Sequence, residues 1–206
     1  MARHVVLCGD SIFDNAAYID GGPDVAAQLR AILGPEDKVT LRAVDGSISS
    51  QLAPQLADFP ADATHLIVST GGNDILHHAA LLEQKVGTIA SALAILGAAA
   101  SEFAAEHRSA VVAATERGIP VAICTIYDAN MGPLITTALS MFNDAITRNV
   151  HEHRADLIDL RLVCRESGDY ANPIEPSVQG GEKIAACIAR YVDEVRQPAN
   201  RTRVFH

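Results

Sequence analysis

Short apolar runs separated by polar turns mark the predicted strands of this chain. Residues 5–8, Val-Val-Leu-Cys, show no polar alternation, which is typical of a strand buried on both faces of a parallel sheet. Four later runs predict further strands, at residues 38–44, 64–70, 120–126 and 155–160. Together the runs predict a sheet of five strands.

Residues with helical spacing fill the segments between these strands. Apolar positions recur every three to four residues from Val25 to Gly34, where a Gly-Pro pair ends the predicted helix. Further helices are predicted at residues 50–58 and 134–153. Ser177 is expected to cap a last helix, which Pro198 ends.

Residues 75–118 are helical by composition but too long for one packed helix. We expect a short helix or loop at residues 77–86 and a long helix after it. The most apolar window, residues 89–100, is interrupted by Ser91 and Gly97 and is shorter than a bilayer span. The sequence therefore predicts a core helix there, packed against the sheet, and no membrane segment.

Strands that alternate with helices predict an α/β fold, since parallel strands need crossover connections that place helices on both faces of the sheet. At 206 residues the chain fits one domain. We expect a single three-layer α/β/α domain over residues 1–206 with a five-stranded parallel sheet, and with residues 1–3 and 198–206 as terminal tails.

Charge and cysteine usage narrow the choice of partners. The net charge of −9 argues against nucleic acid and anionic membrane surfaces, which attract lysine and arginine. The first strand begins too early to leave room for a secretory signal, so a cytoplasmic protein is expected. The four cysteines have no metal-ligand spacing and are expected to be buried thiols.

Small polar residues follow the first three predicted strands. The clusters are Gly9-Asp10-Ser11, Asp45-Gly46-Ser47 and Gly71-Gly72-Asn73-Asp74. Because parallel strands end at one edge of a sheet, these clusters should converge. A hydroxyl nucleophile beside backbone and side-chain N–H donors is the equipment of acyl transfer. The alternative for Ser11 is a helix cap in an ordinary turn.

These three clusters, in this order, resemble the sequence blocks of the SGNH hydrolases, the GDSL-type esterases and lipases. The resemblance implies a flavodoxin-like fold in which Ser11 is the nucleophile. It also implies that the Gly46 amide and the Asn73 side chain donate to the oxyanion.

The fourth block of that family, Asp-x-x-His-Pro-Ser, departs from the pattern in this chain. The matching stretch, residues 172–177, reads Asn-Pro-Ile-Glu-Pro-Ser. Glu175 therefore stands where the family has its general-base histidine, and Asn172 where it has the orienting aspartate. We hypothesise that Glu175 accepts the serine proton, although its reference pKa of about 4.3 makes it a weaker base than histidine unless burial raises it. The Asn172 amide could donate a hydrogen bond to it.

His77 and His78 are the alternative bases, because they follow Asn73 at the correct edge of the sheet. If a helix begins near residue 74, His77 lies one turn beyond Asn73 and could face the site; otherwise both are solvated first-turn residues. Asp10 is expected to be a turn acceptor that holds the Ser11 loop.

The sequence therefore favours a hydrolase that acts on a small-molecule carboxylic ester through Ser11. A non-catalytic ligand-binding protein, suggested by the missing histidine, and an acyltransferase are the alternatives. No nucleotide-binding glycine motif is present, so no cofactor is expected. No metal is expected either, since the Asp-x-His of a binuclear metallophosphatase is missing after the first strand. The sequence does not indicate an oligomeric state.

Overall fold

The computed structural model describes residues 2–198 and 200–206, and its centre is a parallel sheet of six strands. The strand order is β2-β1-β3-β4-β5-β6, and every neighbouring pair is parallel. The strands are β1 (His4–Gly9), β2 (Lys38–Leu41), β3 (His65–Ser69), β4 (Val121–Cys124), β5 (Asp156–Ile158) and β6 (Val204–Phe205).

All five predicted strands are present, and the α/β fold with a parallel sheet is confirmed. The sixth strand corrects the prediction of five, because the segment taken as a tail returns to the sheet. β6 pairs with β5 through Leu157 and Ile158, and Arg203 beside it pairs with the fully buried Asp156. A strand of two residues is too short to show any periodicity in the sequence.

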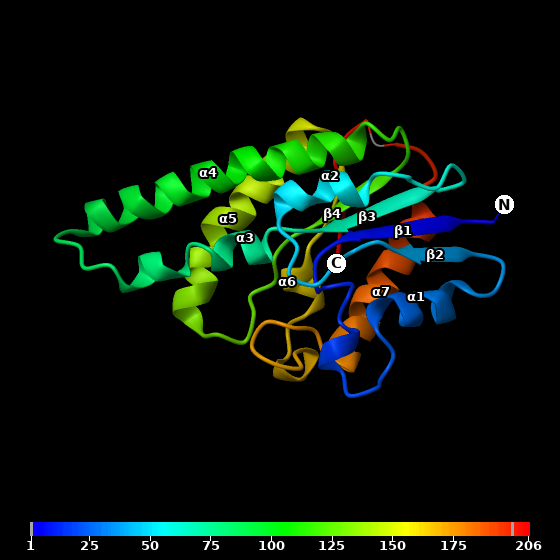
Figure 1. The fold of residues 1–206 in the computed structure, drawn as a ribbon, viewed down its shortest axis with the longest axis horizontal. Helices are drawn as coiled ribbons and strands as arrows, with labels where there is room; N and C mark the ends of the chain where they lie inside the picture. The colour runs from blue at the N-terminus through cyan, green and yellow to red at the C-terminus, as the bar shows by residue number, and fades with distance from the viewer. Residues whose placement is uncertain (1, 199) are drawn as a thin grey trace.

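Helices cover both faces of the sheet (Figure 1). They are α1 (Val25–Leu33), α2 (Leu52–Gln55), α3 (Gly72–Leu76), α4 (Ile89–Thr115), α5 (Pro133–Glu152), α6 (Leu160–Val163) and α7 (Val178–Glu194). Short 3-10 helices lie at η1 (Ala16–Tyr18), η2 (Ser49–Gln51), η3 (Ala79–Glu83) and η4 (Ser167–Asp169). Ser177 caps α7 as expected, since its hydroxyl accepts from the Gly180 N–H.

Alternate residues of β1 separate the two halves of the core. Val5 and Leu7 belong to the cluster under α1 and α7, whereas Val6 and Cys8 belong to the cluster under α2, α4 and α5. Both faces of the strand are fully buried. This arrangement explains why the strand is an unbroken apolar run.

The first half of α4 does not pack as the sequence predicts. Its buried residues begin only at Ala99, whereas Ile89 and Leu93 are 81% and 57% exposed. The helix extends past the carboxyl ends of the strands (Figure 1). By length and composition alone α4 could cross a membrane, but one such helix is weak evidence of a membrane-spanning segment. Alanine occurs on all sides of this segment, so the sequence has no apolar stripe that marks a buried face. Composition therefore could not show that the first half of α4 lies outside the core.

Candidate active site

The carboxyl edge of the sheet brings Ser11, Asn73 and Glu175 to one cavity. Ser11 follows β1, Asn73 lies in α3 directly after β3, and Glu175 lies in the loop before α7. The cavity has a volume of about 140 Å³. Three chain segments far apart in the sequence therefore meet where ligands bind in open α/β sheets.

The turn that presents Ser11 depends on Gly9, whose φ of +122° is rare for other residues. A Cβ atom there would lie 1.7 Å from the carbonyl oxygen of Ser69, so no side chain fits. The next residue, Asp10, donates its N–H to the same carbonyl and accepts the Ile12 N–H on its carboxylate. Asp10 is thus a turn acceptor, as expected, and fixes the direction of Ser11.

Ser11 is hydrogen-bonded to Glu175. Its Oγ donates to Glu175 Oε1 at 3.0 Å, and the two residues are only 7% and 5% exposed. The second carboxylate oxygen, Oε2, is buried and has no partner in the part of the chain that the structure describes. One oxygen of the carboxylate therefore accepts a hydrogen bond from the serine, and the other accepts none from the described residues.

Burial raises the pKa of Glu175 to about 7, a shift that the hydrogen bond from Ser11 opposes and the charge of Asp45 reinforces. Asp10, in the adjacent turn, also has a pKa raised by burial to about 7, although the Ile12 N–H acts against it. Glu175 adds to this shift through charge repulsion. The burial condition under which a glutamate becomes a useful base near neutral pH is therefore met.

Asn172 shapes the Glu175 loop through the backbone. Its Oδ1 accepts from the N–H groups of Ile174 and Glu175, both at 2.9 Å. The expected hydrogen bond from the Asn172 amide to the Glu175 carboxylate is not formed, since that side chain closes a turn instead. The buried Tyr127 adds a second restraint, because its hydroxyl donates to the Ile174 carbonyl at 2.5 Å.

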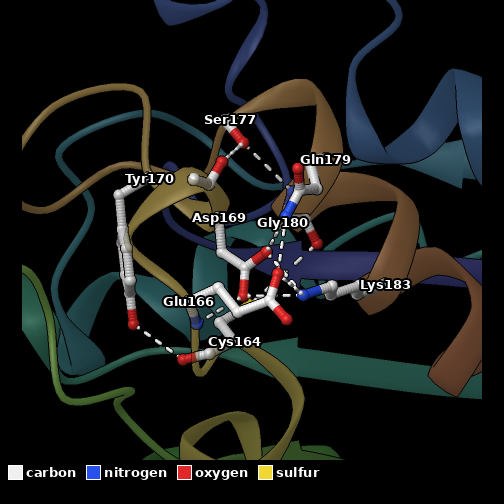
Figure 2. A network of polar contacts seen from close by, with 9 residues as sticks. Cys164, Glu166, Asp169, Tyr170, Ser177, Gln179, Gly180 and Lys183 are labelled. Carbon is white, nitrogen blue, oxygen red and sulfur yellow. Dashed lines mark hydrogen bonds and ion pairs between the residues drawn. The ribbon is translucent and has the colours of Figure 1, made fainter.

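A polar network ties the start of this loop to α7 (Figure 2). The carboxylate of Asp169, which is fully buried, pairs with Lys183 at 2.8 Å. The backbone carbonyl of Asp169 accepts the Ser177 N–H. A Cβ atom added to Gly180 would lie only 2.1 Å from the oxygen of this carbonyl. Attraction to Lys183 helps hold the pKa of Asp169 below its usual value, against the effect of burial. The network fixes both ends of the segment that carries Glu175.

Of the three residues expected to bind an oxyanion, Ser11 and Asn73 line the cavity and Gly46 does not. Among the described residues, no acceptor takes the backbone N–H of Ser11 or of Gly46. Gly46 has φ +77° and is exposed in the loop after β2, outside the lining of the cavity. The side chain of Asn73 donates one N–H to the Ser47 carbonyl at 3.0 Å, which leaves its second amide hydrogen free.

Two residues that hold the loop after β2 and the Ser11 turn were not identified from the sequence as anchors. Asp74 accepts the Ser49 N–H on both carboxylate oxygens, at 3.1 and 3.0 Å. Gln55 is buried and clamps Gly9: its Oε1 accepts the Gly9 N–H while its Nε2 donates to the Gly9 carbonyl. A glutamine in a short helix carries no sequence signal of such a role.

The structure does not bring the alternative histidines to Ser11. His77 is exposed, does not line the cavity and makes no hydrogen bond to Ser11 within the described residues. The His78 ring stacks on Phe142, with 6.5 Å between ring centroids. Across residues 2–198 and 200–206, no group of three or more histidine, cysteine, aspartate or glutamate side chains could hold a metal ion. All four cysteines are buried and free, as expected.

Solved structures with the same fold include several ester hydrolases. An extracellular lipase from Streptomyces rimosus is 14% identical, with a TM-score of 0.66 over 93% of this chain and 99% of that chain. A psychrotrophic esterase from Pseudoalteromonas sp. is 15% identical, with a TM-score of 0.63 over 93% and 99%. A carbohydrate acetylesterase from Sinorhizobium meliloti is 12% identical, with a TM-score of 0.65 over 93% and 99%.

At these identities the structural likeness shows the fold alone. Among curated proteins, none matches the chain. The family model of the GDSL-like lipases and acylhydrolases matches residues 7–183, which include Ser11, Gly46, Asn73 and Glu175. With the match extending over most of its length, the chain belongs to the GDSL-like lipase/acylhydrolase family and is a carboxylic ester hydrolase.

Proposed function

We propose that this protein hydrolyses small-molecule carboxylic esters with Ser11 as nucleophile and Glu175 as general base. The observation that carries the proposal is the buried hydrogen bond of 3.0 Å from Ser11 Oγ to Glu175 Oε1. A nucleophile within hydrogen-bond reach of its base is the arrangement that activates a serine hydroxyl.

Acylation begins when Ser11 Oγ attacks the ester carbonyl carbon and its proton passes to Glu175. The π electrons of the carbonyl move onto its oxygen, which becomes the oxyanion of a tetrahedral intermediate. When the intermediate collapses, the bond to the alcohol oxygen breaks and Glu175 returns the proton to that oxygen. The products of this half-reaction are the free alcohol and a Ser11 ester.

Deacylation repeats these steps with water as the nucleophile. Water attacks the acyl carbon while Glu175 accepts its proton, and collapse breaks the bond to Ser11 Oγ. The proton on Glu175 returns to Ser11, and the carboxylic acid leaves. Glu175 Oε1 supports this step, because it loses the hydrogen bond from Ser11 once the serine carries the acyl group and can then accept the proton of the water.

The developing oxyanion needs hydrogen-bond donors that exist before the reaction. We assign this role to the Ser11 N–H and the second amide hydrogen of Asn73, which line the cavity. The Gly46 N–H is added only on the resemblance to the family, since Gly46 is exposed and lies outside the lining. The support for these donors is the lack of protein acceptors for the two backbone groups in the described part of the chain, together with the ties that hold the 45–49 loop against α3.

Hydrolysis of 4-nitrophenyl butyrate by wild type and Ser11→Ala tests this function. Removing the nucleophile should lower kcat/KM by at least about 10³-fold. Ser109→Ala is the matched control, since its hydroxyl lies on the exposed side of α4 and donates only to the Ala105 carbonyl. Equal rates for wild type and Ser11→Ala would contradict the proposal. Binding of the ester without turnover would instead support the ligand-binding alternative.

A further inference from the structure

The cavity at Ser11 has an apolar part, here called the channel, which is lined by side chains of α3, η3 and α5. These include Ile75 and Leu76 of α3, Leu82 of η3, and Ile135, Ala138 and Leu139 of α5. The only charged side chains in the lining are Asp10 and Glu175, at the Ser11 end. A ligand in this channel can therefore be polar only where it meets the serine.

The loop after β2, where Asp45 and Gly46 lie outside the cavity lining, has the opposite character. The loop after β2 is exposed at Asp45 and Gly46, and Asp45 accepts the Tyr18 hydroxyl at 2.8 Å. Asp14 accepts the Asp45 N–H at 3.0 Å, which places a second carboxylate there. A departing alcohol can leave through this polar, open side, whereas the acyl group must stay bound while it is attached to Ser11.

We propose that the channel binds an aliphatic acyl chain of about six carbons, so that the preferred substrates are medium-chain esters and acetyl esters are poor ones. The inference rests on the proposed function and extends it to the substrate class. The volume of about 140 Å³ supports this size. An apolar cavity of about 150 Å³ in another protein holds benzene, which also has six carbons.

Chain length should change the rate by a predictable amount. Burying one methylene contributes a transfer free energy equivalent to about a fourfold gain in binding. From acetyl to hexanoyl, kcat/KM should thus rise by roughly 10²-fold. Beyond the length that fills the channel, further methylenes emerge near Leu76 and Leu82, which are 43% and 40% exposed, and the gain should level off.

The experiment measures kcat/KM for 4-nitrophenyl esters from acetyl to dodecanoyl, with the Ser11→Ala rate subtracted. A second series keeps acetyl constant and lengthens the alcohol from ethanol to hexanol. The proposal predicts a rise in the acyl series up to about hexanoyl and a flat alcohol series. A flat acyl series, or a rise confined to the alcohol series, would overturn it while Ser11-dependent hydrolysis itself stayed intact.

Substitutions in the channel lining test whether the acyl chain of the substrate binds there. Ala138→Phe and Ala79→Phe each place a ring in the channel and should lower the hexanoyl-to-acetyl ratio of kcat/KM by at least about tenfold. Ala98→Phe is the control, since this exposed alanine of α4 lies outside the lining and should leave the ratio unchanged. An unchanged ratio in both channel variants, with wild-type circular dichroism, would overturn the proposal.

A measurement of ester binding tests the role of the channel independently of catalysis. Calorimetric titration of Ser11→Ala should show methyl hexanoate binding at least tenfold more tightly than methyl acetate. If wild type showed no Ser11-dependent hydrolysis of any ester, the proposed function would fail, and this titration would still decide the channel. Equal affinity for the two esters would overturn it.

Discussion

At the scale of single residues, the site replaces an imidazole with a carboxylate and changes what surrounds it. A histidine base needs an acceptor for its Nδ1–H, which an aspartate supplies in triads. Glu175 has no such proton to place. The residue at the aspartate position, Asn172, instead turns the backbone so that Glu175 faces Ser11.

If Ser11 is the nucleophile and Glu175 its base, as proposed, a different base should function at position 175. Glu175→His is expected to keep measurable Ser11-dependent activity, at least about tenfold above that of Glu175→Gln, because imidazole can accept the serine proton. Steady-state hydrolysis of 4-nitrophenyl hexanoate at pH 8 compares the two variants.

The matched control for these variants is Glu106→Gln, which removes an exposed carboxylate of α4 that lies outside the cavity lining. Its activity should stay close to that of wild type. Equal activities of Glu175→Gln and wild type would show that another group accepts the proton.

The sequence was informative at this scale where residues follow strand ends. Ser11 and Asn73 could be predicted to lie at one edge because they follow neighbouring parallel strands, whereas Glu175 was singled out through the resemblance to the family. Gln55 and Tyr127 could not, since their roles depend on which backbone groups the fold brings within reach. The raised pKa of Glu175 likewise follows from burial, which one sequence does not reveal.

At the scale of elements, the position of Glu175 depends on how closely the 164–177 loop packs on α7. Gly180 permits this contact, because its missing side chain makes room for the Asp169 carbonyl. Figure 2 shows the same residues joined by the Lys183 and Ser177 interactions. The loop and the first turn of α7 therefore form one unit.

Gly180→Ala should lower the free energy of unfolding by about 1 to 3 kcal/mol, the usual cost of overpacking a filled site. It should also lower kcat/KM, because the loop that carries Glu175 must move. Gly97→Ala is the matched control: no atom lies near its added Cβ, and in mid-helix it should stabilise the protein by up to about 1 kcal/mol. Urea unfolding measures both, and a Gly180→Ala variant as stable as wild type would contradict the packing argument.

Element prediction succeeded where burial leaves a clear pattern in the sequence. β1 was predictable because burial of both its faces gives an unbroken apolar run, and α7 because burial of one face makes it amphipathic. The first half of α4 was not, since alanine and leucine surround the helix and no face is marked. β6 was not predicted either, because a strand of two residues at the sheet edge is too short to show a hydrophobic periodicity.

At the scale of the whole molecule, buried carboxyl groups link stability to pH. A carboxyl whose folded pKa is raised, such as Glu175, costs stability once it ionises, so the protein loses stability as pH rises from about 4.5 through about 7. Buried histidines act in the opposite direction. Burial lowers the pKa of His107 to about 4, so stability due to it is gained as pH rises from about 4 to the usual value of about 6.5.

Comparing wild type with Glu175→Gln isolates the carboxyl contribution, because both proteins keep the same histidines. At pH 4.5 ionisation of Glu175 should contribute little to the difference in the free energy of unfolding between the two proteins. As pH rises, the variant should become more stable relative to wild type. At pH 8.5 the gain should be on the order of 3 kcal/mol. Urea unfolding at several pH values measures the difference, and a difference independent of pH would contradict a raised pKa at Glu175.

The most direct test of the central claim is the pH dependence of kcat/KM for 4-nitrophenyl hexanoate in wild type and Glu175→Gln. Since the base must be ionised to accept the serine proton, wild-type activity should rise with pH around a midpoint near 7. In Glu175→Gln the rate should be lower by about 10²-fold or more, and that inflection should vanish. An inflection of the same size and midpoint in Glu175→Gln would contradict the account and assign the base to another group, with Asp10, whose pKa burial also raises to about 7, the first to be replaced.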